Sequence, residues 1–245
     1  MDYKAYLTQK KPPLTPRNIL DRKNYTQTNE HHSFDGWVFS DEKWVQYGEK
    51  LSRYSRYVWS KSSEDVPSDS KVKHPWKVMI FGCITKYKGR GYKSKICFFD
   101  KNVDQLSYIE AVKKIVIPFI TKVYGAPENE RFKKFQQDGA PAHKALKTQQ
   151  FLEKNVKKFI PANEWPGNSF DLNPIELVWA LLDDYLLGEN YKTVLGFKRK
   201  VSQGWEELSI SSIVKCINHS VKRVKQIADA NGGWEKISKS FVTKK

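Results

Sequence analysis

Residues 165–179 read WPGNSFDLNPIELVW, a loop followed directly by an apolar segment. A loop containing Pro and Gly leads into an apolar segment that we predict to be a helix, with Asn173 as its N-cap and Pro174 at its first helical position. Glu176 follows in the first turn. Its carboxylate either completes a capping box with Asn173 and complements the helix dipole, or points away from the helix start and is available for chemistry.

Two further acids, far from Glu176 in the sequence, each close a segment that we expect to be a strand. Asp41 ends the apolar run in VFSDEKW, and Asp138 follows a short strand over 133–137 in FQQDGAPAH. Ligands bind at the C-terminal ends of strands in an α/β sheet, so these acids and Glu176 can meet there. Each Asp can instead be an ordinary turn residue. Asp171 is a fourth candidate, equally consistent with an Asx turn that enters the helix.

Three carboxylates at one edge of a sheet match the needs of a hard divalent cation. Mg²⁺ prefers oxygen ligands and is usually held by a few carboxylates together with substrate phosphate. Two ions, Mg²⁺ or Mn²⁺, support an in-line displacement at phosphorus without a covalent nucleophile. The hypothesis is therefore that Asp41, Asp138 and Glu176 hold metal. His143 is expected to pack at the start of the helix that follows Asp138.

The chain is strongly basic. Lys and Arg total 43 against 27 Asp and Glu, which gives a formal net charge of +16. This excess indicates a polyanionic partner, nucleic acid first, and the plain alternative is a solvated basic surface. The segment KYKGRGYKSK at 86–95 is predicted to be the tip of a hairpin, either a solvated turn or a finger that grips DNA phosphates. The cations of this segment are Lys86, Lys88, Arg90, Lys93 and Lys95.

Cysteine usage and hydropathy point to the inside of the cell. The three cysteines, at 83, 97 and 216, lack C-x-x-C spacing and predict neither a disulfide framework nor a zinc site. No apolar run approaches the length of a membrane span, and the N-terminus lacks the apolar core of a signal peptide. We expect a soluble protein without a membrane partner, and KRK at 198–200 can serve import into the nucleus.

The order of the expected elements predicts one α/β domain over 35–245. Residues 1–34 are polar and Pro-containing and are interpreted as a linker or arm, with a short helix over 18–25 at most. A run of strands, then alternating helix and strand, then helices fits a mixed sheet with helices on both faces. We predict strands at 36–41, 57–59, 76–85, 96–100, 133–137 and 156–160, and helices at 104–120, 142–155 and from 173 onward.

Several blocks of the chain resemble the catalytic domain of the DDE transposases of the Tc1/mariner superfamily. They occur in that family's order between about Leu14 and Gly233. The blocks are FSDEKW (39–44), VMIFGCIT (78–85), FQQDGAPAHKA (135–145), WPGNSFDLNPIELVW (165–179) and RVKQIADANGG (223–233). The resemblance implies an RNase H-like fold, with a mixed five-stranded sheet flanked by helices and a helical C-terminal part.

Carried over block by block, the family's metal-binding triad falls on Asp41, Asp138 and Glu176. The last two are separated by 37 residues, which resembles the DD37E spacing of Tc1-like members. The resemblance implies an enzyme that cuts double-stranded DNA at transposon ends and joins the 3′ ends to a TA target, in other words DNA transposition and DNA integration in the nucleus. The polar stretch at 46–75 corresponds by position to a loop that clamps a partner subunit, which implies a homodimer.

The chain also departs from the family pattern. Gly139 stands where relatives usually have Asn, and Phe170 where they usually have Pro, and both departures are expected to loosen the geometry around the acids. Relatives carry helix-turn-helix modules before the position of Leu14, where this chain has KKPPLTPRNIL, so we expect a catalytic domain without its sequence reader.

Two other functions follow from these departures and from the fold. One is a domesticated or decayed transposon remnant that acts only as a non-specific DNA-binding protein. It would keep the fold and the positive surface but would not cut DNA. The other, RNase H-type hydrolysis of RNA–DNA hybrids, is disfavoured because the blocks match transposases.

Overall fold

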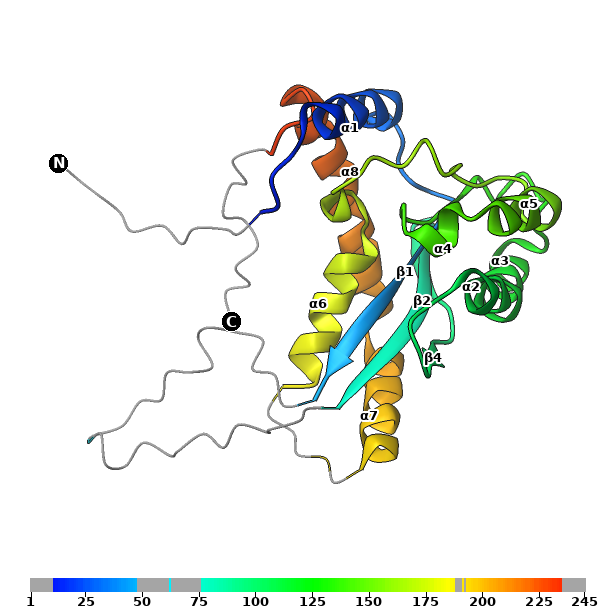
Figure 1. The fold of residues 1–245 in the computed structure, drawn as a ribbon, viewed down its shortest axis with the longest axis vertical. Coiled ribbons are helices and arrows are strands. Elements are labelled where there is room, and N and C mark those ends of the chain that lie inside the picture. The colour runs from blue at the N-terminus through cyan, green and yellow to red at the C-terminus, as the bar shows by residue number, and fades with distance from the viewer. Residues whose placement is uncertain (1–10, 48–61, 63–75, 188–190, 192, 235–245) are drawn as a thin grey trace.

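The structure, a computed structural model, describes residues 11–47, 62, 76–187, 191 and 193–234 (Figure 1). The predicted strand at 57–59 and nearly all of the predicted partner loop at 46–75 lie outside these residues. None of the helices in the described part of the chain combines the length and the hydrophobicity needed to cross a membrane.

Five strands form a mixed sheet, as predicted. They are β1 (Trp37–Gln46), β2 (Lys77–Tyr87), β3 (Arg90–Lys93), β4 (Cys97–Phe99) and β5 (Lys134–Gln136). The order is β3-β2-β1-β5, with β4 also paired to β2, and β1 is antiparallel to β2 but parallel to β5. Within the described residues the strands differ from the prediction at two places. The expected strand at 156–160 contributes only a bridge between Phe135 and Phe159, and β3 lies in the segment at 86–95 that was expected to form a hairpin tip.

The basic segment at 86–95 is built into the sheet and does not project as a tip. Strands β2 and β3 leave only Lys88 and Gly89 between them, with φ values of 50° and 74°. Positive φ at both central residues is typical of a two-residue hairpin turn, which follows the twist of the strands. Beyond β3, Cys83 N–H donates to Ser94 Oγ and Ser94 N–H donates to Cys83 O, both at 2.9 Å. These two bonds attach Ser94 to β2 between the end of β3 and the start of β4.

Helices cover both faces of the sheet. They are α1 (Pro16–Asn29), α2 (Gln105–Ala111), α3 (Ile117–Tyr124), α4 (Pro141–Lys144), α5 (Leu146–Asn155), α6 (Ile175–Tyr185), α7 (Val194–Glu207) and α8 (Ile210–Asp229). A π-helical turn (Val112–Val116) joins α2 to α3, and a 3₁₀ turn (Phe170–Leu172) precedes α6. Helices α6, α7 and α8 lie on one side of the sheet, and α2, α3 and α5 lie on the other (Figure 1).

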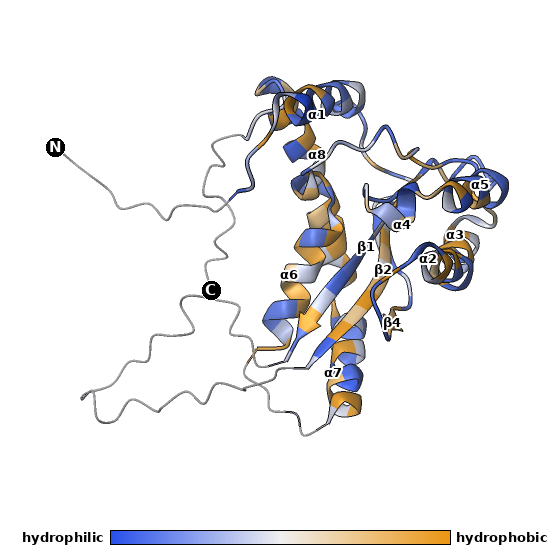
Figure 2. Cartoon of the chain, viewed as in Figure 1, coloured by the Kyte–Doolittle hydropathy of each residue, from blue (hydrophilic) through white to orange (hydrophobic). Residues whose placement is uncertain are grey.

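The side chains of the central strands divide between two cores because successive residues of a strand point to opposite faces. Phe39 and Ile80 pack with the helices of the α6–α8 layer, whereas Val38 and Phe81 pack with those of the α2–α5 layer. Strand β2 is hydrophobic along almost its whole length (Figure 2) and buried from Val78 to Lys86. A strand covered on both faces has this composition.

Helix α1 packs against α8, so the N-terminal segment belongs to the packed body from Pro16 onward. The helix is longer than the short one expected inside the arm. Thr15 caps it by accepting a hydrogen bond from Asn18 N–H at 3.1 Å, and Tyr25 contacts Trp165 edge to face, with ring centroids 5.2 Å apart. Its buried side includes polar residues, Arg22 among them, and therefore lacks the apolar periodicity of a typical packed helix.

Candidate active site

Asp41 lies in the middle of β1 and not at its end, so this part of the strand prediction is wrong. The strand continues to Gln46 because residues 42–46 stay paired with β2. Its parallel neighbour β5 ends at Gln136, which pairs with Phe39, so Phe39 is the last residue of β1 that pairs with β5. Asp41 therefore lies beyond the last residue pair between β1 and β5, on the side of the sheet where β5 has its C-terminal end.

Asp138 follows β5 by two positions, at the same edge of the sheet. Its Oδ1 accepts a hydrogen bond from Ala140 N–H at 2.9 Å, which is an Asx-turn contact. The turn role that we considered as an alternative is thus present, but it uses one oxygen only. Within the described residues Oδ2 has no hydrogen-bond partner.

Glu176 lies in the first turn of α6, which begins at Ile175. The helix start is one residue later than predicted, a difference within the usual uncertainty of helix ends. Asn173 does not form a capping box with Glu176 among the described residues. Its Nδ2 instead donates to Ser40 O at 3.2 Å and its Oδ1 accepts from Ile175 N–H at 3.4 Å. Asn173 therefore fixes the start of α6 against β1 and leaves the Glu176 carboxylate free to face the cleft.

The three predicted acids line one cleft. It has a volume of about 360 Å³, and Asp41, Asp138 and Glu176 contribute to its wall together with residues of the 165–173 loop. Trp179, one turn after Glu176 on α6, donates its indole N–H to Asp41 Oδ2 at 3.1 Å. The helix that presents one acid thus also orients another.

Negative charge accumulates in this cleft. Burial is the main cause that raises the pKa of Asp41 well above its ordinary value. Repulsion by three neighbouring carboxylates adds to this shift, those of Glu176, Glu42 and Asp138. Burial also raises the pKa of Glu176, although the positive charge of Lys43 opposes it. A cation bound among these groups would relieve the repulsion and compensate the burial.

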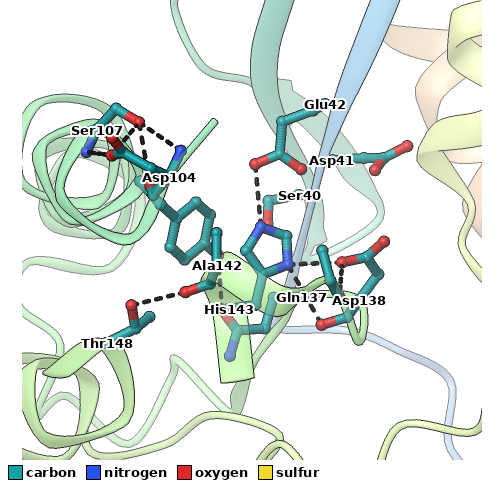
Figure 3. Close-up of polar contacts among 12 residues, drawn as sticks. Ser40, Asp41, Glu42, Asp104, Ser107, Gln137, Asp138, Ala142, His143 and Thr148 are labelled. Atoms are coloured by element: carbon teal, nitrogen blue, oxygen red, sulfur yellow. Dashed lines mark hydrogen bonds and ion pairs between the residues drawn. The ribbon is translucent and has the colours of Figure 1, made fainter. Parts of the chain in front are cut away.

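His143 lies between two carboxylates (Figure 3), in a network that our sequence analysis missed. Its Nδ1 is 2.6 Å from Asp138 Oδ1 and its Nε2 is 3.1 Å from Glu42 Oε1. The imidazole packs on Tyr108, with ring centroids 4.0 Å apart. Burial alone would lower the pKa of His143, but the two carboxylates raise it to about 10, so the ring is protonated at neutral pH. Burial alone would likewise raise the pKa of Asp138, and the contact with His143 reverses this and lowers it.

The expected place of His143 is correct, since it lies in α4 and is buried, but its partner Glu42 could not be named. Asp41 and Glu42 are adjacent in a strand, so their side chains point to opposite faces of the sheet. For this reason Glu42 was not expected to share a site with Asp41. The available signal was a second acid inside a strand together with a His five residues after Asp138.

Asp171 is held away from a ligand role by a buried arginine. Arg22 Nη1 and Nη2 donate to its two carboxylate oxygens at 2.7 and 2.9 Å, and the Arg22 side chain is fully buried. Paired oxygens and a planar guanidinium form the bidentate geometry that favours Arg over Lys. This pair could not be predicted from local patterns, because 149 positions separate the two residues.

The five predicted DNA-contacting cations fall into two groups. Lys86 and Lys93 are engaged inside the protein, and burial lowers the pKa of both. Lys88, Arg90 and Lys95 are exposed. The Lys86 ammonium donates to Ser33 O and Asn218 Oδ1 at 2.9 and 2.8 Å, and that of Lys93 donates to the carbonyls of Trp205, Glu206 and Leu208 at 2.5, 2.6 and 2.8 Å.

The acid cleft has the right donor chemistry for a hard cation. Oδ1 of Asp41 and Oδ2 of Asp138 have no hydrogen-bond partner in the described part of the chain, and Glu176 adds a third carboxylate. In the described residues, no three or more His, Cys, Asp or Glu side chains are grouped so that they could hold a metal ion as they stand. Binding an ion would therefore require the three carboxylates to move closer together.

Curated relatives of the chain are transposases. The Tc1 transposase of Caenorhabditis elegans is 26% identical over 229 residues, which cover 91% of this chain and 79% of the relative. The Tc3 transposase of the same organism is 25% identical over 224 residues, which cover 90% of this chain and 64% of the relative. No protein-family model matches the chain.

Solved structures with the same fold come from the Mos1 mariner transposase. The crystal structure of its catalytic domain matches with a TM-score of 0.66 at 16% identity, over 93% of this chain and all of the matched chain. The Mos1 paired-end complex with Mn matches with a TM-score of 0.75 at 17% identity, over 96% of this chain and 68% of the matched chain. These matches confirm the predicted RNase H-like fold.

Proposed function

Because the chain is a homologue of the Tc1/mariner DDE transposases, we propose that it is a transposase catalytic domain that cuts DNA strands and joins them to a target. The observation that carries the proposal is the meeting of Asp41, Asp138 and Glu176 at one cleft. These acids come from three separate elements, and their charges oppose one another. Divalent cations bound there would offset this repulsion, and the phosphates of DNA would in turn approach the acids through the bound cations.

Two of the three acids, Asp41 and Asp138, are held by neighbouring groups in a way that suits a metal ligand. Trp179 holds one oxygen of Asp41, so the other oxygen keeps a fixed direction. His143 and the Ala140 amide hold Oδ1 of Asp138, and the lowered pKa keeps this carboxylate ionised. Metal ions held here, Mg²⁺ or Mn²⁺ and two in number, would supply the activation of a water or 3′-hydroxyl and the stabilisation of the leaving oxygen. The related Mos1 catalytic domain has been crystallised with Mn and with Mg.

DNA is the proposed substrate. The net charge of +16 favours phosphate binding through counterion release. Lys88 and Arg90 offer exposed cations on the β2–β3 hairpin, and Lys95 offers one just after β3. Structures of Mos1 include paired-end complexes and a strand transfer complex. We further propose that the chain acts as a homodimer through the segment at 46–75 and that it works in the nucleus.

The proposal is tested by strand cleavage on a duplex that ends in the element's own terminal sequence. With Mg²⁺ or Mn²⁺ the wild-type chain should nick this DNA, and EDTA should stop the reaction. Asp138→Asn and Glu176→Gln should abolish nicking while DNA binding, followed by fluorescence anisotropy, stays intact. Asp184→Asn is the matched control, because this acid is exposed on the same helix as Glu176 and outside the cleft.

Two outcomes would overturn the proposal. Nicking by Asp138→Asn and Glu176→Gln at the wild-type rate would remove the acids from the chemistry. A wild-type chain that binds DNA without metal-dependent nicking would favour the alternative of a transposon remnant. Affinity alone does not separate the two functions, since both predict non-specific binding that weakens steeply with salt.

A further inference from the structure

Phe170 places an exposed aromatic ring at the acid cleft. The side chain is 48% exposed although it is apolar, and it lines the same cleft as Asp41, Asp138 and Glu176. Isolated exposed apolar residues are common on protein surfaces and need no function. Phe170 differs from such residues because the structure on both sides of it is unusually well fixed.

A single buried guanidinium fixes the backbone around Phe170. Arg22 Nη1 donates to Ser169 Oγ at 3.1 Å and to Asn168 O at 3.2 Å, and the guanidinium also pairs with Asp171 through both carboxylate oxygens. Arg22 therefore contacts both sequence neighbours of Phe170. Arg22 itself is fully buried, so its guanidinium has no access to water as an alternative partner, and these bonds hold the 3₁₀ turn in one conformation.

The Phe170 ring is also supported from behind. It contacts Trp234, with centroids 5.8 Å apart and planes inclined by 43°. Trp234 is fixed in turn, since its indole N–H donates to Pro12 O at 3.0 Å and the Arg22 guanidinium lies 4.5 Å from its ring centroid. This support leaves about half of the Phe170 surface exposed. An aromatic ring held in this way loses little conformational entropy when a planar ligand stacks on it.

Lys144 brings a cation to the same cleft. A Cβ atom added to Gly139 would lie 3.0 Å from Lys144 Cε and 3.1 Å from Lys144 Nζ, so the absence of a side chain at Gly139 leaves room for the lysine. Lys144 is exposed and lines the cleft together with Phe170. An aromatic ring and a cation that line one cleft offer the combination that binds unpaired nucleotides, with the ring stacking on the base and the cation contacting the phosphate.

We infer that Phe170 and Lys144 form a subsite for an unpaired nucleotide at the end of a DNA strand, next to the acids. An unpaired nucleotide at a strand end suits this subsite because its base has an uncovered face, whereas the faces of a base inside a duplex are covered by its neighbours. This inference rests on the proposed function only in taking DNA as the substrate. Within that function, the subsite holds the strand end beside Asp41, Asp138 and Glu176.

The test follows the fluorescence of a 2-aminopurine base, which falls when the base stacks. The probe is a short duplex with an unpaired 3′ end that carries 2-aminopurine as its last base, and Ca²⁺ replaces Mg²⁺. The wild-type chain should quench this base, Phe170→Trp should preserve the quenching, and Phe170→Ala and Phe170→Leu should remove it. Trp44→Ala is the matched control, because Trp44 is 46% exposed and does not line the cleft.

The affinity of the unpaired end gives a second readout. Phe170→Ala should weaken it by about 5- to 150-fold, the range expected for one lost base–aromatic stack. Lys144→Ala should reduce the slope of log affinity against log salt by about 0.7, the value for one single-strand phosphate contact. Lys147→Ala, an exposed neighbour outside the cleft lining, should leave both quantities unchanged.

Quenching by Phe170→Ala equal to that of the wild-type chain would overturn the subsite, even if the chain nicks DNA. Quenching that depends on Phe170 would support the subsite, even if the wild-type chain proves unable to nick. The fluorescence experiment and the nicking experiment therefore fail independently. A probe with the 2-aminopurine inside the duplex should not respond to Phe170, and an equal response there would also contradict the inference.

Discussion

Replacing His143 with glutamine should expose the largest electrostatic contribution within the candidate site. The imidazolium of His143 stands between Glu42 and Asp138, and its side chain is 3% exposed. Glutamine keeps a hydrogen-bond donor but removes the positive charge, so both carboxylates lose their buried counter-charge. Breaking a buried ion pair by removing one partner costs about 3–5 kcal/mol.

The pKa of His143 leads to a similar magnitude. The contacts raise it from 6.5 to about 10, and each unit corresponds to about 1.36 kcal/mol, which gives roughly 5 kcal/mol as an upper value. Since the folded protein binds this proton more tightly than the unfolded chain, the stabilisation is fully present below pH 6.5 and is lost as the pH rises through about 10. The free-energy difference between the wild-type chain and His143→Gln should follow the same course.

The assay is urea unfolding followed by tryptophan fluorescence, with EDTA present so that bound metal does not contribute. At about pH 7 the variant should be less stable by about 3–5 kcal/mol, and near pH 10 most of this difference should disappear. His31→Gln is the control, because its side chain is 91% exposed and its contact with Glu30 should contribute little. A loss below about 1 kcal/mol at pH 7, or a loss that does not change with pH, would refute the reasoning.

Three other substitutions test separate parts of the structure. Arg22→Ala should lower the free energy of unfolding by about 3–5 kcal/mol, because Asp171 stays behind without its partner, whereas the exposed Arg17→Ala should change it by less than about 1 kcal/mol; equal effects would contradict the account. Lys93→Met should lower the free energy of unfolding by about 1–3 kcal/mol, because the carbonyl contacts at the end of α7 are lost, and should leave DNA affinity unchanged. Unchanged stability in unfolding measurements together with weaker DNA binding by anisotropy would instead restore a DNA-contacting role. Trp179→Phe should weaken Mn²⁺ binding, measured by calorimetry, by about 10- to 100-fold because Asp41 loses its orienting hydrogen bond, and an unchanged affinity would argue against that orientation.

Local sequence signals predicted the elements that carry the acids. The loop at 165–173 and the apolar segment behind it were enough to place a helix start at Asn173 within two residues. A short apolar run likewise indicated the strand before Asp41, and a short strand was placed before Asp138. These signals are strong because each depends on residues close together in the chain.

Features that depend on pairing between distant segments could not be predicted in the same way. The length of β1 beyond Asp41 is set by its antiparallel partner β2, because the polar residues that follow the acid give no sign of a continuing strand. The basic segment at 86–95 looked uniformly exposed, yet packing of α7 and α8 against the sheet engages Lys93 and Lys86. The buried polar face of α1 depends on Arg22, whose partners lie more than a hundred residues away.

The proposed function requires Asp41, Asp138 and Glu176 together to hold the divalent metal ions of a DNA-cutting enzyme. Anomalous X-ray scattering from crystals of this chain grown with Mn²⁺ and a DNA end tests it most directly. Two manganese peaks about 3.5–4 Å apart, bound by oxygens of these three carboxylates, are expected. Manganese peaks only at other carboxylates, or a cleft that stays without manganese at saturating Mn²⁺, would contradict it.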